Sequence, residues 1–149
     1  MDMNYRIPPK PEYFQTVPEG TCRWCNLPVA LTPTGKVSKS RWHPICLEEY
    51  KRIFWPKVTR NLVWKRDKGK CASCGKISPT KSLTWHMDHI KPLYEANGDI
   101  TYWYLENIQT LCLKCHREKT SHEATMRAEK RKELKCESVQ APTVSSDIE

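Results

Sequence analysis

The chain has 149 residues, a net charge of +8 and a sequence pI near 9.1. This length allows one small domain, or two very small ones, with a modest buried core. No segment approaches the length of a membrane span, and the first 20 residues lack the apolar stretch of a signal peptide. We therefore expect a cytoplasmic rather than a secreted or membrane protein, and the basic charge favours a polyanionic partner.

Eight cysteines are the strongest compositional signal, and six of them form three C-x-x-C pairs: Cys22/Cys25, Cys71/Cys74 and Cys112/Cys115. Disulfides are rare in a reducing compartment, where paired spacing is typical of zinc binding. If zinc ions were bound by these thiolates, the net charge would fall to about +5, so the protein would remain basic.

The N-terminal part predicts a small zinc unit. Residues 1–20 carry four of the eleven prolines, which favours an extended segment. Within residues 21–46, three cysteines and one histidine have the spacing of a structural zinc site: Cys22, Cys25, His43 and Cys46. The alternative is an ordinary polar His43 and a buried Cys46 thiol.

Two helices should follow, over residues 46–55 and 57–68, separated by Pro56 and stopped near Gly69. Residues 51–70 hold eight Lys or Arg and one Asp. This run predicts two tryptophans packed inward, Trp55 and Trp64, and basic groups that face phosphates. The candidates for nucleic-acid binding, with one from a later helix, are Lys51, Arg52, Lys57, Arg60, Lys65, Arg66 and Lys119.

A second zinc site is predicted more strongly. Two C-x-x-C pairs enclose 37 residues and can close a tetrahedral four-cysteine site, formed by Cys71, Cys74, Cys112 and Cys115. Four thiolates leave no open position, so such a site is structural rather than catalytic. The alternative is two unrelated reduced pairs.

Between and after these pairs we expect a strand over residues 83–90, a turn over 95–98 and a charged helix from Leu113 to about Lys135. The segment 137–149 has the composition of a disordered tail. Cys136 has no partner in the pattern and is expected to be idle. The expected organisation is an extended 1–20, a zinc knuckle with a helix over 21–56, a second domain over 57–136, and the tail.

Residues 71–120 resemble the HNH nuclease family. The resemblance lies in the order and spacing of residues inside the four-cysteine frame: Asp88-His89-x-x-Pro92, Asn107 and Cys115-His116-x-x-Lys119-Thr120. It implies a small α+β fold with a ββα-metal unit: two strands, a loop and a helix around one divalent ion. His89 would end the first strand, Asn107 would lie in the loop before the helix, and His116 on the helix.

The chemistry agrees with this resemblance. A neutral imidazole can take a proton from water, so His89 is the candidate general base. Asp88 and His116 are the candidate ligands of a catalytic Mg²⁺, Mn²⁺ or similar ion. The amide of Asn107 would either orient the His89 ring or reach the ion. His86 shares a strand face with Asp88 and is a minor candidate for contact with the ion or a phosphate.

The sequence therefore predicts a metal-dependent endonuclease that hydrolyses duplex or branched DNA, with structural zinc as a further cofactor. The alternatives are an RNA-cleaving nuclease and a non-enzymatic, zinc-stabilised module that binds nucleic acid. A looser resemblance connects the zinc knuckle and basic helix to HNH modules of annealing helicases and to stand-alone HNH proteins of phages and bacteria. It suggests a bacterial or phage-infected cell as the setting.

Overall fold

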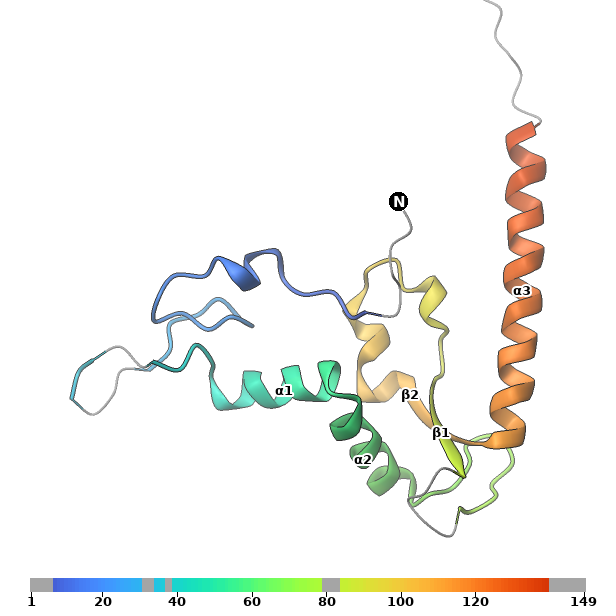
Figure 1. Ribbon diagram of the computed structural model, residues 1–149, viewed down its shortest axis with the longest axis horizontal. Helices are drawn as coiled ribbons and strands as arrows, with labels where there is room; N and C mark the ends of the chain where they lie inside the picture. Colours follow the sequence, from blue (N-terminus) through green and yellow to red (C-terminus); the bar gives the residue numbers. More distant parts are fainter. Residues whose placement is uncertain (1–6, 31–33, 37–38, 79–83, 140–149) are drawn as a thin grey trace, which may run out of the picture.

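The computed structural model describes residues 7–30, 34–36, 39–78 and 84–139, and Figure 1 shows their arrangement. Within these ranges, helices and a two-stranded sheet make the predicted small α+β fold. The elements in chain order are α1 (Pro44–Phe54), α2 (Pro56–Asp67), β1 (Trp85–His89), β2 (Ile108–Cys112) and α3 (Leu113–Val139). None of the described helices is both long and apolar enough to cross a membrane.

Prolines set the boundary between α1 and α2. Pro44 and Pro56 each occupy the first turn of a helix, where the missing backbone N–H leaves no intrahelical hydrogen bond unmade. Pro56 also favours an extended conformation for Trp55, which has φ −113° and ψ 93°, so one helix ends and the next begins here. Both helices lie within two residues of their predicted bounds, which confirms the prediction.

α2 ends in a turn that requires glycine. Lys68 has a left-handed φ of 51°, and Gly69 follows with a φ of 68°. A Cβ atom on Gly69 would lie 2.5 Å from the ring of Trp64, which covers this turn. The predicted helix stop near Gly69 is therefore confirmed, and the close approach of Trp64 gives it a second physical reason.

β1 and β2 form an antiparallel pair in which Trp85 faces Cys112 and Asp88 faces Gln109. The strand predicted over 83–90 is confirmed from Trp85 to His89, while Thr84 and Ile90 flank it and Leu83 lies outside the described residues. The sequence pattern did not locate β2, because it lies between Asn107 and the helix, where a loop was expected. That expectation was wrong: Asn107 precedes a strand, and α3 follows this strand directly.

The two faces of this sheet carry different elements. On one face, Trp85 and Ile108 pack with Val63 of α2 in a buried cluster, with Trp64 against it. On the other face, the side chains of His86 and Asp88 contact His116 and Lys119 of α3. Trp64 is thus packed inward as predicted, but Trp55 is 49% exposed, so the prediction for Trp55 was wrong. Its ring lies at the turn between α1 and α2, outside the core.

The N-terminal segment packs on α1. Its described part, 7–20, is not wholly extended, because a 3₁₀ helix spans Glu12–Gln15. Phe14 is buried and stacks on Tyr50 of α1 with ring centroids 5.6 Å apart, and Val17 is buried as well. Aromatic packing of this kind joins the N-terminal segment to α1.

α3 is the longest element and extends well beyond the rest of the fold (Figure 1). The predicted helix is confirmed, but it continues past Lys135 to Val139. Residues 137–139 are therefore helical where a disordered tail was expected, and 140–149 lie outside the described residues. The side chain of Cys136 also lies outside the described part of the structure.

Candidate active site and metal centres

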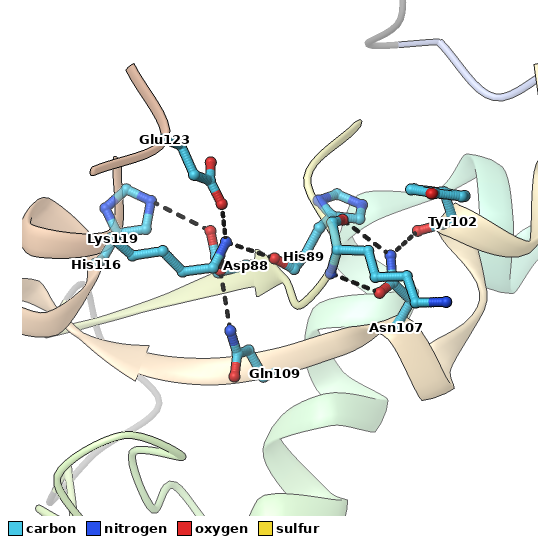
Figure 2. Close-up of polar contacts among 9 residues, drawn as sticks. Asp88, His89, Tyr102, Asn107, Gln109, His116, Lys119 and Glu123 are labelled. Carbon is cyan, nitrogen blue, oxygen red and sulfur yellow. Dashed lines mark hydrogen bonds and ion pairs between the residues drawn. The ribbon is translucent and has the colours of Figure 1, made fainter. Parts of the chain in front are cut away.

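Among the described residues, the hydrogen bonds to Asp88, near the end of β1, reach one of its two carboxylate oxygens (Figure 2). Lys119 Nζ donates to Oδ2 at 2.9 Å, and the cross-strand partner Gln109 donates to the same oxygen through Nε2 at 3.2 Å. The other oxygen, Oδ1, lies 3.9 Å from Nε2 of His116. The side chain is 14% exposed. The carboxylate is thus oriented with one oxygen directed at His116.

His116 lies in the first turn of α3 and stacks on His86 of β1. Their ring centroids are 4.1 Å apart and their planes are inclined by 12°. Burial lowers the pKa of His86, and the neighbouring His116 lowers it further, so His86 is neutral near pH 7. His86 therefore supports the His116 ring. Among the described residues, no compact cluster of three metal-ligating side chains includes His86.

Lys119 is an internal cation, one turn beyond His116. Besides Asp88, its Nζ contacts the carboxylate of Glu123 and donates to the backbone carbonyl of His89 at 2.7 Å. Burial alone would lower the pKa of Lys119, but hydrogen bonds to Glu123 and Asp88 outweigh it and raise the pKa above its ordinary value. Sequence reasoning missed Glu123, although its spacing four residues after Lys119 on a helix is a signal for such a pair.

His89, the last residue of β1, lines a small pocket of about 240 Å³. Around it lie aromatic, apolar and charged side chains from β1, the following loop and α3: Asp88, Pro92, Leu93, Tyr94, Lys119, Glu123 and Arg127. Burial lowers the pKa of His89 below its ordinary value, although the nearby Asp88 opposes this shift. The imidazole makes no hydrogen bond to any residue that the structure describes. A neutral ring at the pocket wall can accept a proton.

Asn107 fastens the loop that follows His89. Its Oδ1 accepts from the backbone N–H of Lys91 at 2.8 Å, and its Nδ2 donates to the carbonyls of Lys91 and Tyr102 at 3.2 and 2.8 Å (Figure 2). Its own carbonyl accepts from the N–H of Ile90 at 2.7 Å. The amide thus contacts backbone groups and, among the described residues, not the His89 ring. The second alternative, contact with the ion, stays a prediction.

Asp88 and His116 could together hold one divalent ion. An octahedral ion with ligands near 2.1 Å places two donors about 3.0 Å apart when adjacent and about 4.2 Å apart when opposite. The 3.9 Å between Asp88 Oδ1 and His116 Nε2 lies between these values. One carboxylate oxygen and one imidazole nitrogen would leave the remaining positions to water and substrate, as an open catalytic site needs.

The four-cysteine group has the geometry of a structural zinc site. Among its members Cys71, Cys74, Cys112 and Cys115, all four sulfurs lie within 4.8 Å of one another. Cys74 Sγ and Cys112 Sγ are 3.8 Å apart, which matches the separation of about 3.8 Å expected for two sulfurs 2.3 Å from a tetrahedral zinc. No described cysteine forms a disulfide. These residues could bind zinc and clamp the two ends of the β1–β2 unit together.

The N-terminal group of Cys22, Cys25, His43 and Cys46 is equally compact. His43 Nδ1 lies 3.4 Å from Cys25 Sγ and 3.9 Å from Cys46 Sγ, around the sulfur–nitrogen distance of about 3.5 Å expected for zinc. His43 Nε2 lies 3.0 Å from the carbonyl oxygen of Pro28, so Nε2–H can donate there and leave Nδ1 for the metal. This set could also bind zinc.

The first knuckles of the two sites share one backbone pattern. The amides of Cys22 and Cys71 each donate to the carbonyl five residues later at 2.9 Å, and each cysteine's carbonyl accepts from the amide four residues later. The residue after the second cysteine has a positive φ in both, 58° at Asn26 and 73° at Gly75. This equivalence supports the interpretation of the N-terminal group as a true knuckle.

The thiol chemistry also fits a bound cation. Burial raises the pKa of Cys22 and Cys71, but backbone N–H groups of each knuckle outweigh it and bring both to about 6. Burial and then the neighbouring sulfurs raise the pKa of Cys46 to about 12. Thiolates this close together repel one another, so a cation is needed to hold all of them deprotonated.

Two of the predicted nucleic-acid-binding side chains, Arg60 and Arg66, make internal contacts with neighbouring elements. Arg66 donates to the carbonyls of Leu105 and Ile108 at 2.6 and 2.5 Å, and Arg60 donates to the carbonyl of Trp85 at 3.1 Å, so both fasten α2 to the sheet. Lys119 lies in the site described above. Lys51 lies 5.3 Å from the ring centroid of Trp55, Arg52 pairs with Glu48, and Lys57 and Lys65 are exposed.

Comparison with known proteins places this geometry in a family. The family model for the HNH endonuclease matches residues 71–122, which contain the four-cysteine group and the Asp88 site. Segments of the DNA annealing helicase and endonuclease ZRANB3 are 40% identical over 55 residues in mouse (Mus musculus) and 39% over 56 in human (Homo sapiens). These matches cover 37% and 38% of this chain, but span only 5% of either relative.

A phage protein matches over most of its length. The probable HNH endonuclease of Lactococcus phage SK1 is 37% identical over 76 residues, which cover 48% of this chain and 74% of the phage protein. No solved structure shows a significant match. On the strength of this relative and of the family model, the chain belongs to the HNH endonuclease family.

Proposed function

We propose that the protein is a metal-dependent endonuclease that hydrolyses DNA phosphodiester bonds, with His89 as general base and one divalent ion held by Asp88 and His116. The observation that carries the proposal is the convergence at one strand end. Asp88 Oδ1 faces His116 Nε2 at 3.9 Å, while the adjacent His89 lines the pocket beside them. A bound divalent ion supplies Lewis acidity, which polarises the phosphate and stabilises charge on the departing oxygen.

His89 is suited to take the proton of the attacking water. Its pKa is lowered by burial, so the ring is neutral near pH 7 and can act as a base. Phosphodiester hydrolysis by this route gives a 5′ phosphate and a 3′ hydroxyl. Asn107 would act as a positioning residue, because it holds the backbone at Lys91, two residues beyond the base.

Lys119 would orient the metal ligand and the base together. It holds Oδ2 of Asp88 and the carbonyl of His89, which leaves Oδ1 of Asp88 directed toward His116. This arrangement favours a single-oxygen contact between Asp88 and the ion. Lys119 was expected to contact phosphate, whereas its observed partners favour a positioning role.

DNA is the proposed substrate for two reasons. The relatives in mouse and human are named as DNA annealing helicases and endonucleases, and the chain carries a net charge of +8. A polyanion is the expected partner of such a charge. A purely structural binding module would not need an oriented carboxylate and a neutral imidazole at one pocket.

A plasmid assay tests the proposal. Supercoiled DNA incubated with the full chain should be nicked in the presence of Mg²⁺ or Mn²⁺, and cleavage should stop when EDTA is added. DNA ligase should reseal the nicked product, because it carries a 5′ phosphate and a 3′ hydroxyl. Cleavage that continues in EDTA, or no cleavage with any divalent ion, would contradict the proposed activity.

A further inference from the structure

Packing does not explain the length of α3. Its last described contact with another element is that of Arg127, whose guanidinium lies 5.4 Å from the ring centroid of Tyr94. Every described side chain from Glu129 onward is exposed, and Figure 1 shows this part of the helix standing clear of the fold. A polar helix that buries nothing is marginal on its own in water, so its retention here calls for another role.

The exposed part has a basic face in line with the active site. His116, Lys119, Glu123 and Arg127 follow one another at intervals of three or four residues, and all four lie on the side facing Asp88, His89 and Tyr94. Continued along the helix, this spacing reaches two further cations, which we call the α3 basic face: Lys130 and Arg131.

Acidic groups lie elsewhere on the same helix. At 100° per residue, Glu129 and Glu133 lie about 150° and about 110° around the axis from the midpoint between Lys130 and Arg131. Lys132 also lies away from the α3 basic face, because it is two residues, and hence about 160° around the axis, from Lys130. Positive charge is thus gathered on the side that leads out of the catalytic pocket.

We propose that the α3 basic face binds the phosphates of duplex DNA that flanks the bond to be cut. The inference rests on the proposed function, because a substrate held in the pocket of His89 must continue past the helix. Lys119 and Lys130 lie on the same side of the helix, and at a rise of 1.5 Å per residue they are about 16 Å apart along its axis. At 3.4 Å per base pair this equals about five base pairs of duplex.

The position of the α3 basic face favours duplex DNA over other polyanions. Lys130 and Arg131 lie one turn beyond Arg127, which lines the pocket of His89. The phosphates nearest to them therefore belong to the substrate held in that pocket. Arg127 joins the two parts, because it lies at the rim of the pocket and at the root of the α3 basic face.

Two lysines on nearly opposite sides of α3 provide a matched test. Full-length Lys130→Gln and Lys132→Gln remove the same charge within two residues, and Gln preserves helix propensity. Binding to a labelled 25-base-pair duplex is measured by fluorescence anisotropy across a salt series, without added divalent ion. Lys130→Gln should lower the slope of log affinity against log salt by about 0.9, and Lys132→Gln should match wild type.

The double variant Lys130→Gln/Arg131→Gln should lose about 1.8 in slope and about tenfold in affinity at 0.1 M salt. Circular dichroism and zinc content check that the variants remain folded. Equal slopes for Lys130→Gln, Lys132→Gln and wild type would overturn the inference, as would losses confined to a hairpin RNA of equal length. If wild type itself binds no duplex, the proposed DNA substrate fails first, which separates the two conclusions.

Discussion

At the residue scale, Asp88 shows how the neighbours of a metal ligand set its orientation. Its Oδ2 is held by Lys119 and Gln109, while Oδ1 faces His116. Groups that orient a ligand in this way typically affect metal affinity or activity by about 10- to 100-fold when they are removed. Lys119 has the strongest such contact, because it is charged and also holds the carbonyl of His89.

Lys119→Met should therefore lower the turnover number for DNA cleavage by about 10- to 100-fold with little change in KM. The substitution disturbs the orientation of Asp88 and His89 but not the binding of DNA. Lys114→Met is the matched control, since Lys114 lies on the same helix with its side chain 84% exposed. It should leave both constants unchanged. A rise in KM for Lys119→Met with an unchanged turnover number would instead indicate the phosphate contact expected from sequence.

The positions of Asp88, His89 and His116 could be predicted from sequence, because the family pattern ties each residue to an element. The partners could not be predicted. Glu123 belongs to no motif, and the contacts of Asn107 with Lys91 and Tyr102 depend on how a loop folds back on itself. The internal contacts of Arg60 and Arg66 could not be predicted either, because a run of basic residues shows the charge but not which way each side chain points.

At the element scale, local rules were sufficient where proline or glycine decides the backbone. They predicted the break at Pro56 and the stop at Gly69. They did not locate β2, because a short strand such as Ile108–Cys112 is established by its pairing with β1 and by packing against α2. Their prediction that Trp55 packs inward was wrong. Sequence spacing alone cannot show that the turn before Pro56 places this ring outside the core.

The turn at Gly69 offers a test at this scale. Gly69→Ala should destabilise the fold by about 2 kcal/mol or more, because it adds a strained positive φ and a clash with the Trp64 ring. Gly98→Ala is a control with a similar φ, 87°, and no neighbouring atom within 4 Å of the added Cβ. Urea unfolding should show the larger loss for Gly69→Ala. Equal losses would show that Trp64 does not restrict this turn.

At the scale of the whole molecule, buried packing is divided among small clusters and not gathered in one core. One cluster joins α2 to the sheet, and another surrounds Ile53 and Trp103. A third consists of Leu111 with Cys71 and Cys115 of the four-cysteine group. Small domains with such limited cores depend on metals or other crosslinks for stability. The two cysteine-rich groups should therefore be needed for the fold itself.

Zinc content gives the corresponding prediction. The wild-type chain should carry two zinc ions, and Cys25→Ser should carry one, because it removes one ligand of the N-terminal group only. Removal of both ions with a strong chelator should abolish the far-ultraviolet circular dichroism signal of the helices. A single zinc in wild type, or an unchanged spectrum after complete removal, would contradict this account of the fold.

The central claim concerns His89, and one comparison tests it most directly. Plasmid cleavage in Mg²⁺ or Mn²⁺ is measured for wild type, His89→Ala and His122→Ala, the last altering an exposed histidine of α3. We expect His89→Ala to lose cleavage while it keeps DNA binding and zinc content, and His122→Ala to cleave as wild type does. Undiminished cleavage by a folded His89→Ala variant would remove His89 from the mechanism and contradict the proposed site.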